Sequence, residues 1–183
     1  TASHNPAHYN GFKVIIKGQV IAGPTLQLLK PMLDAAEFTV SDGGQYFQRD
    51  ITTQYVRHII EESSIDRPFK IVVDGGNAVA GPVALKLFDS LGCMAFPLHC
   101  EVDGGFPNHE PNPADEKNLQ ELITKVKDVK ADLGFAFDGD GDRIVAISAN
   151  GEIVWPDKLM MIFARDILAR NTGADIVFDV KSS

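Results

Sequence analysis

The fold of this chain is decided by residues 69–99, which read FKIVVDGGNAVAGPVALKLFDSLGCMAFPLH. The apolar run at 69–74 predicts a strand, residues 81–91 a helix closed by Gly92, and residues 93–99 a second strand. A strand, a helix and a strand in this order predict a parallel pair joined by a right-handed crossover. This unit therefore indicates an α/β fold.

The same alternation of strands and helices continues on both sides of this unit. Asn150 and Gly151 predict a hairpin, and Pro31 is expected to kink or split the helix that contains it. The remaining expected elements are strands at 12–16, 132–137, 144–148 and 152–155, a strand-like run at 175–180, and helices at 25–36, 50–63, 114–130 and 156–171.

An acidic loop follows the strand expected at 132–137, because residues 138–143 read DGDGDR. Two unit charges ~4 Å apart repel by ~4 kcal/mol at an effective dielectric of ~20. A hard divalent cation turns that repulsion into binding, and glycine lets the backbone bend tightly enough to aim the carboxylates at one point. The loop therefore predicts a Mg²⁺ or Ca²⁺ site at Asp138, Asp140 and Asp142, and a solvated acidic turn is the alternative.

An EF-hand does not explain this loop. An EF-hand has glycine at its sixth position and a carboxylate at its twelfth, and counting from Asp138 these positions hold Arg143 and Ala149. An octahedral Mg²⁺ site that leaves a position open for a phosphate oxygen fits better.

A second polar loop lies at the start of the chain, where residues 1–6 read TASHNP and residues 8–13 read HYNGFK. Ser3 lies beside His4, and Pro6 keeps this segment from becoming a helix. The strand expected from Phe12 places Lys13 where the chain leaves the loop. By itself, a serine next to a histidine is equally typical of an ordinary surface loop.

Together the two loops resemble those of the α-D-phosphohexomutase superfamily. TASHNP is similar to that family's phosphoserine loop and DGDGDR to its metal loop, and about 135 residues separate them. NGFK at 10–13, VDGGN at 73–77 and VDGGFPNH at 102–109 match further family patterns. The resemblance covers essentially the whole chain and is strongest to the bacterial phosphomannomutase/phosphoglucomutase branch.

The resemblance implies several mixed-sheet α/β domains around a central cleft. This chain would contain the end of the first domain at 1–49, the second domain at 50–152 and the start of the third at 153–183. The sequence begins at Thr1, inside a motif, and stops after the strand-like run. We therefore interpret it as a segment of a longer polypeptide and expect the isolated segment to be inactive.

The resemblance also implies a reaction, the interconversion of the 1-phosphate and 6-phosphate of mannose and/or glucose. Phosphorylated Ser3 would donate its phosphoryl group to the hexose phosphate substrate, forming glucose or mannose 1,6-bisphosphate. His4 would orient the loop or assist proton transfer, and Lys13 would be the general acid/base, unless it is simply a solvated lysine. Mg²⁺ would be the cofactor, with Ser3, Asp138, Asp140 and Asp142 as its ligands.

The resemblance also implies roles for two cationic side chains, and three other functions remain as alternatives. Arg143 would contact the phosphoserine or substrate, with a salt bridge to the aspartates as the alternative, and Lys181 would approach the sugar phosphate. The rivals are a phosphoglucosamine mutase, a non-catalytic Mg²⁺-binding module that retains the fold, and a phosphatase that releases phosphate to water.

Composition limits the function classes. The chain has 183 residues, is 44% hydrophobic and carries a formal charge of −8, which allows a real core and argues against a nucleic-acid surface. No apolar run approaches the ~18 residues of a membrane span, and no signal peptide is recognisable. Cys93 and Cys100 are expected to be buried free thiols of a cytoplasmic protein, although their spacing also allows a disulfide.

The remaining polar motifs have structural explanations beside functional ones. The loop at 74–81 could bind phosphate at a helix N-terminus, but it is not a GxGxxG dinucleotide motif, and a plain tight turn that packs sheet against helix is the favoured explanation. His109 either shapes the active cleft or holds a structural loop. His8, His58 and His99 are expected to be core or surface histidines rather than ligands.

Overall fold

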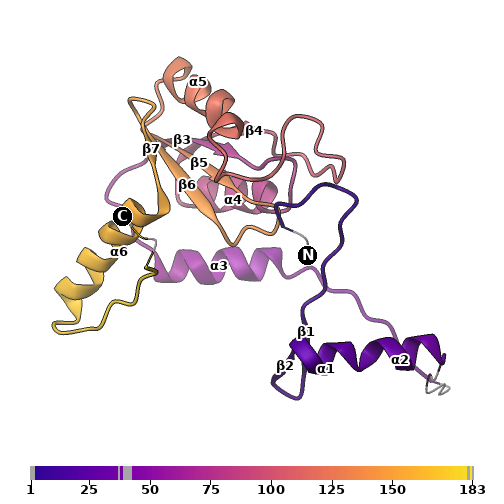
Figure 1. Cartoon of the computed structure of the whole chain (residues 1–183). Coiled ribbons are helices and arrows are strands. Elements are labelled where there is room, and N and C mark those ends of the chain that lie inside the picture. The colour runs from indigo at the N-terminus through magenta and orange to yellow at the C-terminus, as the bar shows by residue number, and fades with distance from the viewer. Residues whose placement is uncertain (1–2, 37, 39–42, 181, 183) are drawn as a thin grey trace.

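The computed structural model describes residues 3–36, 38, 43–180 and 182. Its main feature is a five-stranded sheet (Figure 1). In spatial order the strands are β4 (Met94–Leu98), β3 (Lys70–Asp74), β5 (Leu133–Phe137), β6 (Ile144–Ser148) and β7 (Ile153–Val154). β3 is parallel to β4 and β5, whereas β6 is antiparallel to β5 and β7. The predicted α/β fold with a mixed sheet is therefore confirmed.

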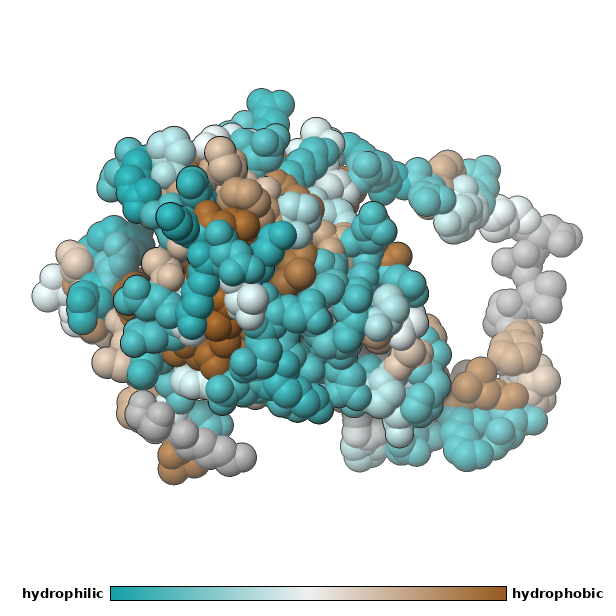
Figure 2. Space-filling model, turned by 90° about the horizontal axis from the view of Figure 1, so that it is seen from above, coloured by the Kyte–Doolittle hydropathy of each residue, from teal (hydrophilic) through white to brown (hydrophobic). Residues whose placement is uncertain are grey.

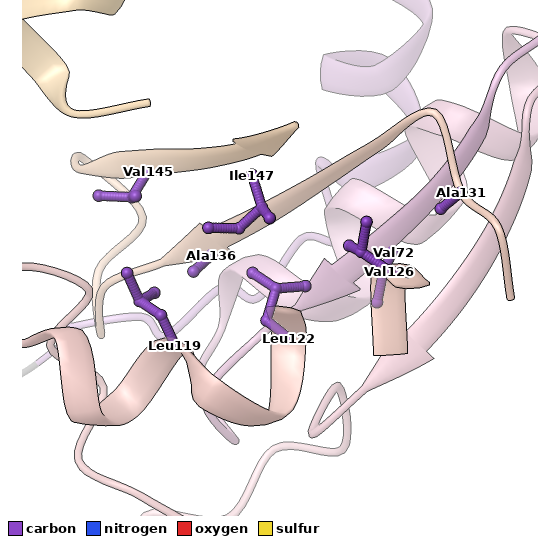
Figure 3. Close-up of a cluster of buried hydrophobic side chains, with 8 residues drawn as sticks. All are labelled: Val72, Leu119, Leu122, Val126, Ala131, Ala136, Val145 and Ile147. Carbon is purple, nitrogen blue, oxygen red and sulfur yellow. The ribbon is translucent and has the colours of Figure 1, made fainter. Parts of the chain in front are cut away.

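Helices cover both faces of this sheet, with α4 (Ala80–Ser90) on one face and α5 (Gln120–Asp128) on the other (Figure 1). α3 (Thr52–Glu62) packs against α4. Successive residues of a strand point to opposite faces, so Val72 packs toward α5 while Ile71 and Val73 pack toward α4. Figure 3 shows the cluster on the α5 side, which consists of Val72, Leu119, Leu122, Val126, Ala131, Ala136, Val145 and Ile147.

The parallel strands bring three loops to one edge of the sheet. Asp74, the last residue of β3, is in register with Leu98 of β4 and Ala136 of β5. Parallel strands end at the same edge, so the segments that follow β3, β4 and β5 all begin there. The acidic loop follows β5 at this edge.

The hairpin at 144–154 forms as predicted. Ala146 pairs with Val154 and Ile147 with Ile153. Gly151 has a φ of 82° and donates its N–H to the Ser148 carbonyl at 2.8 Å. A residue without Cβ adopts this backbone conformation most easily, which explains the Asn-Gly turn signal.

The first 34 residues contain a second hairpin and two short helices: β1 (Val14–Ile16), β2 (Gln19–Ile21), α1 (Gly23–Gln27) and α2 (Leu29–Asp34). β2 was not predicted from the sequence, although the turn residues Lys17 and Gly18 both have positive φ, as in type I′ turns. Leu28 interrupts the helix three residues before Pro31. Proline lacks an N–H and clashes with the carbonyl four residues earlier, so the predicted split is confirmed.

The C-terminal part contains α6 (Pro156–Arg170), which begins at the predicted proline. The prediction of a strand-like element at 175–180 is wrong, because the structure has no regular element there. Val177 and Phe178 are exposed, and within the described part of the chain no strand pairs with this segment. An apolar run without a neighbouring strand has no partner for its backbone hydrogen bonds.

The helix expected at 114–130 starts later than predicted. A turn at 112–115 precedes it, in which Asn112 and Asp115 side chains accept the N–H groups of Ala114 and Lys117. The 3₁₀ helix η1 (Glu116–Leu119) then leads into α5. Short polar side chains that bond to nearby backbone amides favour such turns over a regular helix.

The face seen in Figure 2 is mostly hydrophilic, with hydrophobic residues gathered between the polar ones. Of the helices in the described residues, none has both the length and the apolar character that a membrane span requires.

Candidate active site

The carboxyl ends of β3 and β5 form the natural ligand-binding edge of this sheet. The chain leaves β3 through α4 toward β4, but leaves β5 toward β6 on the other side. In open α/β sheets, ligands bind in the crevice where neighbouring strands have connections that depart in opposite directions. Asp74 ends one of these strands and Asp138 follows the other.

The acidic loop converges as the sequence predicted. Each of Asp138, Asp140 and Asp142 offers one carboxylate oxygen, and these oxygens lie within 4.8 Å of one another. Asp138 is fully buried, Asp140 is half-buried and Asp142 is exposed. The loop is closed by the Arg143 N–H, which donates to Asp138 Oδ1 at 3.0 Å, and by the Gly141 N–H, which donates to the Asp138 carbonyl at 3.1 Å.

The donor set of this loop fits a hard divalent cation. Carboxylate oxygens are the ligands that Mg²⁺ and Ca²⁺ prefer, and Mg²⁺ is commonly held by few carboxylates together with phosphate and water. Partial desolvation raises the pKa of the Asp142 carboxyl, and the negative charges of Asp138 and Asp140 raise it further. A bound cation would relieve that repulsion.

Ser3 lies against this loop although it is remote in sequence. Its Oγ donates a hydrogen bond to Asp138 Oδ2 across 135 residues, and His4 Nδ1 is 3.4 Å from the same Oγ. The backbone approach is close, because a Cβ atom at Gly139 would lie 2.8 Å from the Ser3 carbonyl carbon. Gly139 therefore allows the first loop of the chain to reach the acidic loop.

Two cationic side chains complete the cluster. Lys13 Nζ lies 3.5 Å from Asp140 Oδ2 and 3.9 Å from Asp142 Oδ2. Arg143 Nε lies 4.0 Å from Asp138 Oδ2. The structure thus brings together every predicted site residue except Lys181, which lies outside the described residues.

The other polar motifs have structural partners. The segment at 74–81 is a tight turn, because a Cβ at Gly75 would lie 2.9 Å from Gly81 Cα, and Asp74 Oδ1 accepts the Gly76 N–H. His99 Nε2 lies 2.8 Å from Glu121 Oε2, and His58 is an exposed partner of Glu62. Exposed His8 packs its ring on Tyr9.

The two cysteines are free and buried, so the disulfide alternative is excluded. Burial raises the pKa of the Cys100 thiol, whose Sγ contacts the Val73 carbonyl at 3.2 Å. A buried thiol with a raised pKa behaves as a small apolar side chain rather than as a nucleophile.

One partly buried pair, between His109 and Asp74, was not predicted from the sequence. His109 Nε2 lies 3.1 Å from Asp74 Oδ2, and Asp74 is fully buried. The only signal in the sequence was an aspartate at the end of an apolar strand, which does not identify its partner 35 residues later.

Comparison with known proteins agrees with the geometry of this site. Residues 53–151, more than half of the chain, match the family model of phosphoglucomutase/phosphomannomutase alpha/beta/alpha domain II. A phosphomannomutase/phosphoglucomutase of Pseudomonas aeruginosa is 48% identical over 181 residues, covering 99% of this chain and 39% of that protein. A phosphoglucomutase of Neisseria meningitidis is 45% identical and is covered to 40% of its length.

A solved structure gives the same result. The crystal structure of a phosphoglucomutase/phosphomannomutase family protein from Burkholderia thailandensis superposes with a TM-score of 0.87 at 47% identity, over 95% of this chain and 38% of that one. The chain thus spans about two fifths of the length of the curated relatives it matches. With its second-domain match, its identity to relatives along its whole length and its superposition on a solved family member, the chain belongs to the phosphoglucomutase/phosphomannomutase family.

Proposed function

We propose that this chain carries the phosphoserine and metal loops of a phosphohexomutase that interconverts the 1-phosphate and 6-phosphate of mannose and/or glucose. The observation that carries the proposal is the hydrogen bond from Ser3 Oγ to Asp138 Oδ2, which joins the two loops. The relatives at 45–48% identity are a phosphomannomutase/phosphoglucomutase and a phosphoglucomutase, which supports the sugar class.

In the proposed reaction, Ser3 is the residue that carries and exchanges the phosphoryl group. The bond between phosphorus and Ser3 Oγ breaks, and a bond forms between phosphorus and the free hydroxyl oxygen of the hexose phosphate. The product of this half-reaction is a hexose 1,6-bisphosphate and an unphosphorylated Ser3. Transfer of the other phosphoryl group back to Oγ restores the enzyme and releases the isomeric monophosphate.

Asp138, Asp140 and Asp142 would hold Mg²⁺ together with an oxygen on Ser3. When bound, the cation supplies positive charge to the oxygens of the transferring phosphoryl group. Phosphoryl transfer is catalysed mainly by positioning and charge stabilisation, so a fixed trio of carboxylates next to the serine is the arrangement it requires.

The remaining site residues would handle protons and phosphate charge. Lys13 is proposed as the general acid/base for the sugar hydroxyl, because its ammonium lies at the mouth of the aspartate cluster. His4 Nδ1, 3.4 Å from Oγ, would orient Ser3 or pass a proton to it. Arg143 would pair with phosphate oxygens, as guanidinium groups commonly do, and Lys181 is proposed as a second phosphate contact on family resemblance alone.

Several wider properties belong to the same proposal. The domain divisions at 1–49, 50–152 and 153–183, the 1,6-bisphosphate intermediate and a cytoplasmic location follow from the resemblance. Neither a nucleic acid nor a membrane is proposed as a partner. Because the chain spans about two fifths of its relatives, we also propose that these 183 residues alone do not complete the reaction.

A phosphoglucosamine mutase is the nearest alternative, since it would share both loops, and hexosamine phosphate should be assayed beside mannose and glucose phosphates. A non-catalytic module or a phosphatase is less well supported. The five groups that mutase chemistry needs, namely Ser3, Lys13, Asp138, Asp140 and Asp142, form one connected cluster.

The proposal is tested in a chimaera in which this chain replaces the matching segment of the Pseudomonas aeruginosa relative. With Ser3 intact, we expect mutase activity and a mass gain of one phosphate on Ser3. Ser3→Ala should lower kcat by more than about 10³-fold, because the phosphoryl acceptor is lost. Exposed Ser64→Ala is the matched control. Full activity of the Ser3→Ala chimaera would remove Ser3 from the mechanism.

A further inference from the structure

His109 makes a set of partly buried polar contacts that the proposed reaction does not use. Its Nε2 is 3.2 Å from Asp74 Oδ1 and 3.1 Å from Oδ2, and its Nδ1 is 2.8 Å from the Glu110 carbonyl. The His109 side chain is 14% exposed and that of Asp74 is 1% exposed. The ring is therefore enclosed between the end of β3 and its own loop.

The partners of the two ring nitrogens favour the doubly protonated form of His109. A carbonyl oxygen only accepts hydrogen bonds, so Nδ1 must carry a proton. Asp74 Oδ1 also accepts the Gly76 N–H at 2.9 Å, as an ionised carboxylate does. With Asp74 ionised, Nε2 donates as well, and an imidazole that donates from both nitrogens is an imidazolium.

We propose that His109 is a charged imidazolium at neutral pH and that its pair with Asp74 is a pH-sensitive latch. The latch fastens residues 99–112, which follow β4, to the carboxyl end of β3 and thereby holds the turn at 75–80 against the acidic loop. His109 is a positioning residue in this proposal, because it touches neither substrate nor the metal ligands. The latch goes beyond the proposed phosphoryl transfer and does not depend on it.

The latch is the charged member of a set of contacts between these two segments. Asn77, with a φ of 56°, donates its N–H to the His99 carbonyl at 2.7 Å. Asn108 Nδ2 donates to Asn77 Oδ1 at 2.7 Å. Pro111 is fully buried, and a Cβ at Gly76 would lie 3.2 Å from its Cβ. The neighbours of His109 on both sides are thus bound to the turn after β3.

The turn at 75–80, which follows β3, also contacts the acidic loop. Ala80 lies at the end of that turn, and a Cβ at Gly141 would lie 3.1 Å from Ala80 Cβ. Gly141 has a φ of 75° and is the glycine between Asp140 and Asp142. Movement of the turn would therefore be transmitted to the loop that carries the carboxylates.

Several charged or titratable side chains surround His109, and they come from β3, from the segment after β4, from α5 and from its own loop. Asp74 lies at the end of β3, and Cys100 follows β4 beside Asp74. The His99 ring meets the His109 ring edge-on at 5.3 Å and pairs with Glu121 of α5. Glu110 is the neighbour on its own loop. Apart from His99, every one of these groups is neutral or negative.

These surroundings set the sign of the pH dependence. The hydrogen bond to Asp74 raises the pKa of His109 above its ordinary 6.5, burial opposes this, and the charges of Asp74 and Glu121 add to the increase. A histidine whose pKa is higher in the folded state stabilises the fold fully below its unfolded pKa. The latch is therefore closed below about pH 6.5 and opens as the pH rises through the raised value.

Ring-nitrogen NMR of the ¹⁵N-labelled chain tests the charge directly. At pH 7 we expect both nitrogens of His109 to be protonated, and exposed His58, with 68% of its side chain accessible, serves as the reference ring. This measurement needs no variant, metal or sugar, so its outcome is separate from that of the mutase proposal. A neutral His109 ring with a single proton at pH 7 would overturn the proposal.

Hydrogen exchange tests the latch. In H109Q, which keeps a donor but not the charge, the protection factors of the Asn77, Asp103 and Gly141 amides should fall about tenfold at pH 6, as expected for loss of a charge-assisted hydrogen bond. D74N should give the same loss, and the double variant should add little to either single one. H58Q is the matched control.

The pH profile separates a latch from a passive structural role. Protection of the same three amides in the unsubstituted chain should decrease as the pH rises through the His109 pKa, after correction for intrinsic exchange. In H109Q the protection should no longer depend on pH in that range. Equal pH profiles in both chains, or unchanged protection in H109Q, would refute the latch.

Discussion

Gly139→Ala is the sharpest test of how the active site is assembled. A Cβ atom at this position would lie 2.8 Å from the Ser3 carbonyl carbon and 3.3 Å from Ser3 Cα, with the carbonyl oxygen nearest of all. These atoms are backbone and cannot rotate away. Gly139 has a φ outside the left-handed region, so the substitution adds a clash without adding backbone strain.

The size of the effect follows from these distances. Carbon atoms pack best at ~3.5–4.0 Å, so the Ser3 backbone must retreat by about 1 Å. Such a shift breaks the hydrogen bond between Ser3 Oγ and Asp138, and hydrogen bonds to charged groups contribute ~1.5–3 kcal/mol. A misplacement of ~1 Å in a reacting group can lower the rate about 10²-fold.

The assay is mutase activity of the chimaera described above, together with the thermal midpoint of the isolated chain. We expect kcat to fall about 100-fold and the midpoint to fall by several degrees, as the loss of a hydrogen bond contributing ~1.5–3 kcal/mol implies for a chain of this size. Gly104→Ala is the matched control, since a Cβ there meets no atom within 4 Å. Undiminished activity of Gly139→Ala would show that Ser3 does not lie against the acidic loop during turnover.

Two further predictions concern the metal site and the core. Mg²⁺ should raise the thermal midpoint of the chain, by an amount equivalent to ~2.7 kcal/mol when its concentration is 100 times Kd. Asp140→Asn should abolish most of this shift, whereas the control Asp128→Asn on α5 should not. Equal shifts in the two variants would contradict the metal assignment. Gly134→Ala should reduce the free energy of unfolding in urea by ~1–3 kcal/mol through overpacking, because its Cβ would lie 2.6 Å from Val126 Cγ2 and 3.0 Å from Leu122 Cδ1. An unchanged urea midpoint would mean that α5 can move away from β5 at little cost.

Much of the fold was predictable because its signals are local. The apolar run before Asp74 and the helix that ends before Gly92 lie in one continuous stretch, so the unit of β3, α4 and β4 was recognised almost to the residue. The Asn150–Gly151 turn and Pro156 are equally local. The run at 175–180 failed for the opposite reason, because a strand depends on a partner that no local pattern reveals.

The candidate site was predictable to the extent that its residues cluster in sequence. The spacing of three aspartates alone predicts a cation site at Asp138, Asp140 and Asp142, and in the structure their carboxylates lie close together. The contact of Ser3 with Asp138 came from family resemblance, since nothing in either loop specifies the other. The pair of His109 and Asp74 was missed because each residue is unremarkable in its own segment, and only the folded sheet edge joins them.

The 135-residue separation of Ser3 and Asp138 has a consequence for the order in which the molecule folds. Closing so long a loop costs conformational entropy that local contacts do not repay. We therefore expect the central sheet to form first and the amino-terminal loop to dock onto it last. A phosphate or cation that binds only after this docking should slow the unfolding of the finished protein while leaving its refolding rate nearly unchanged.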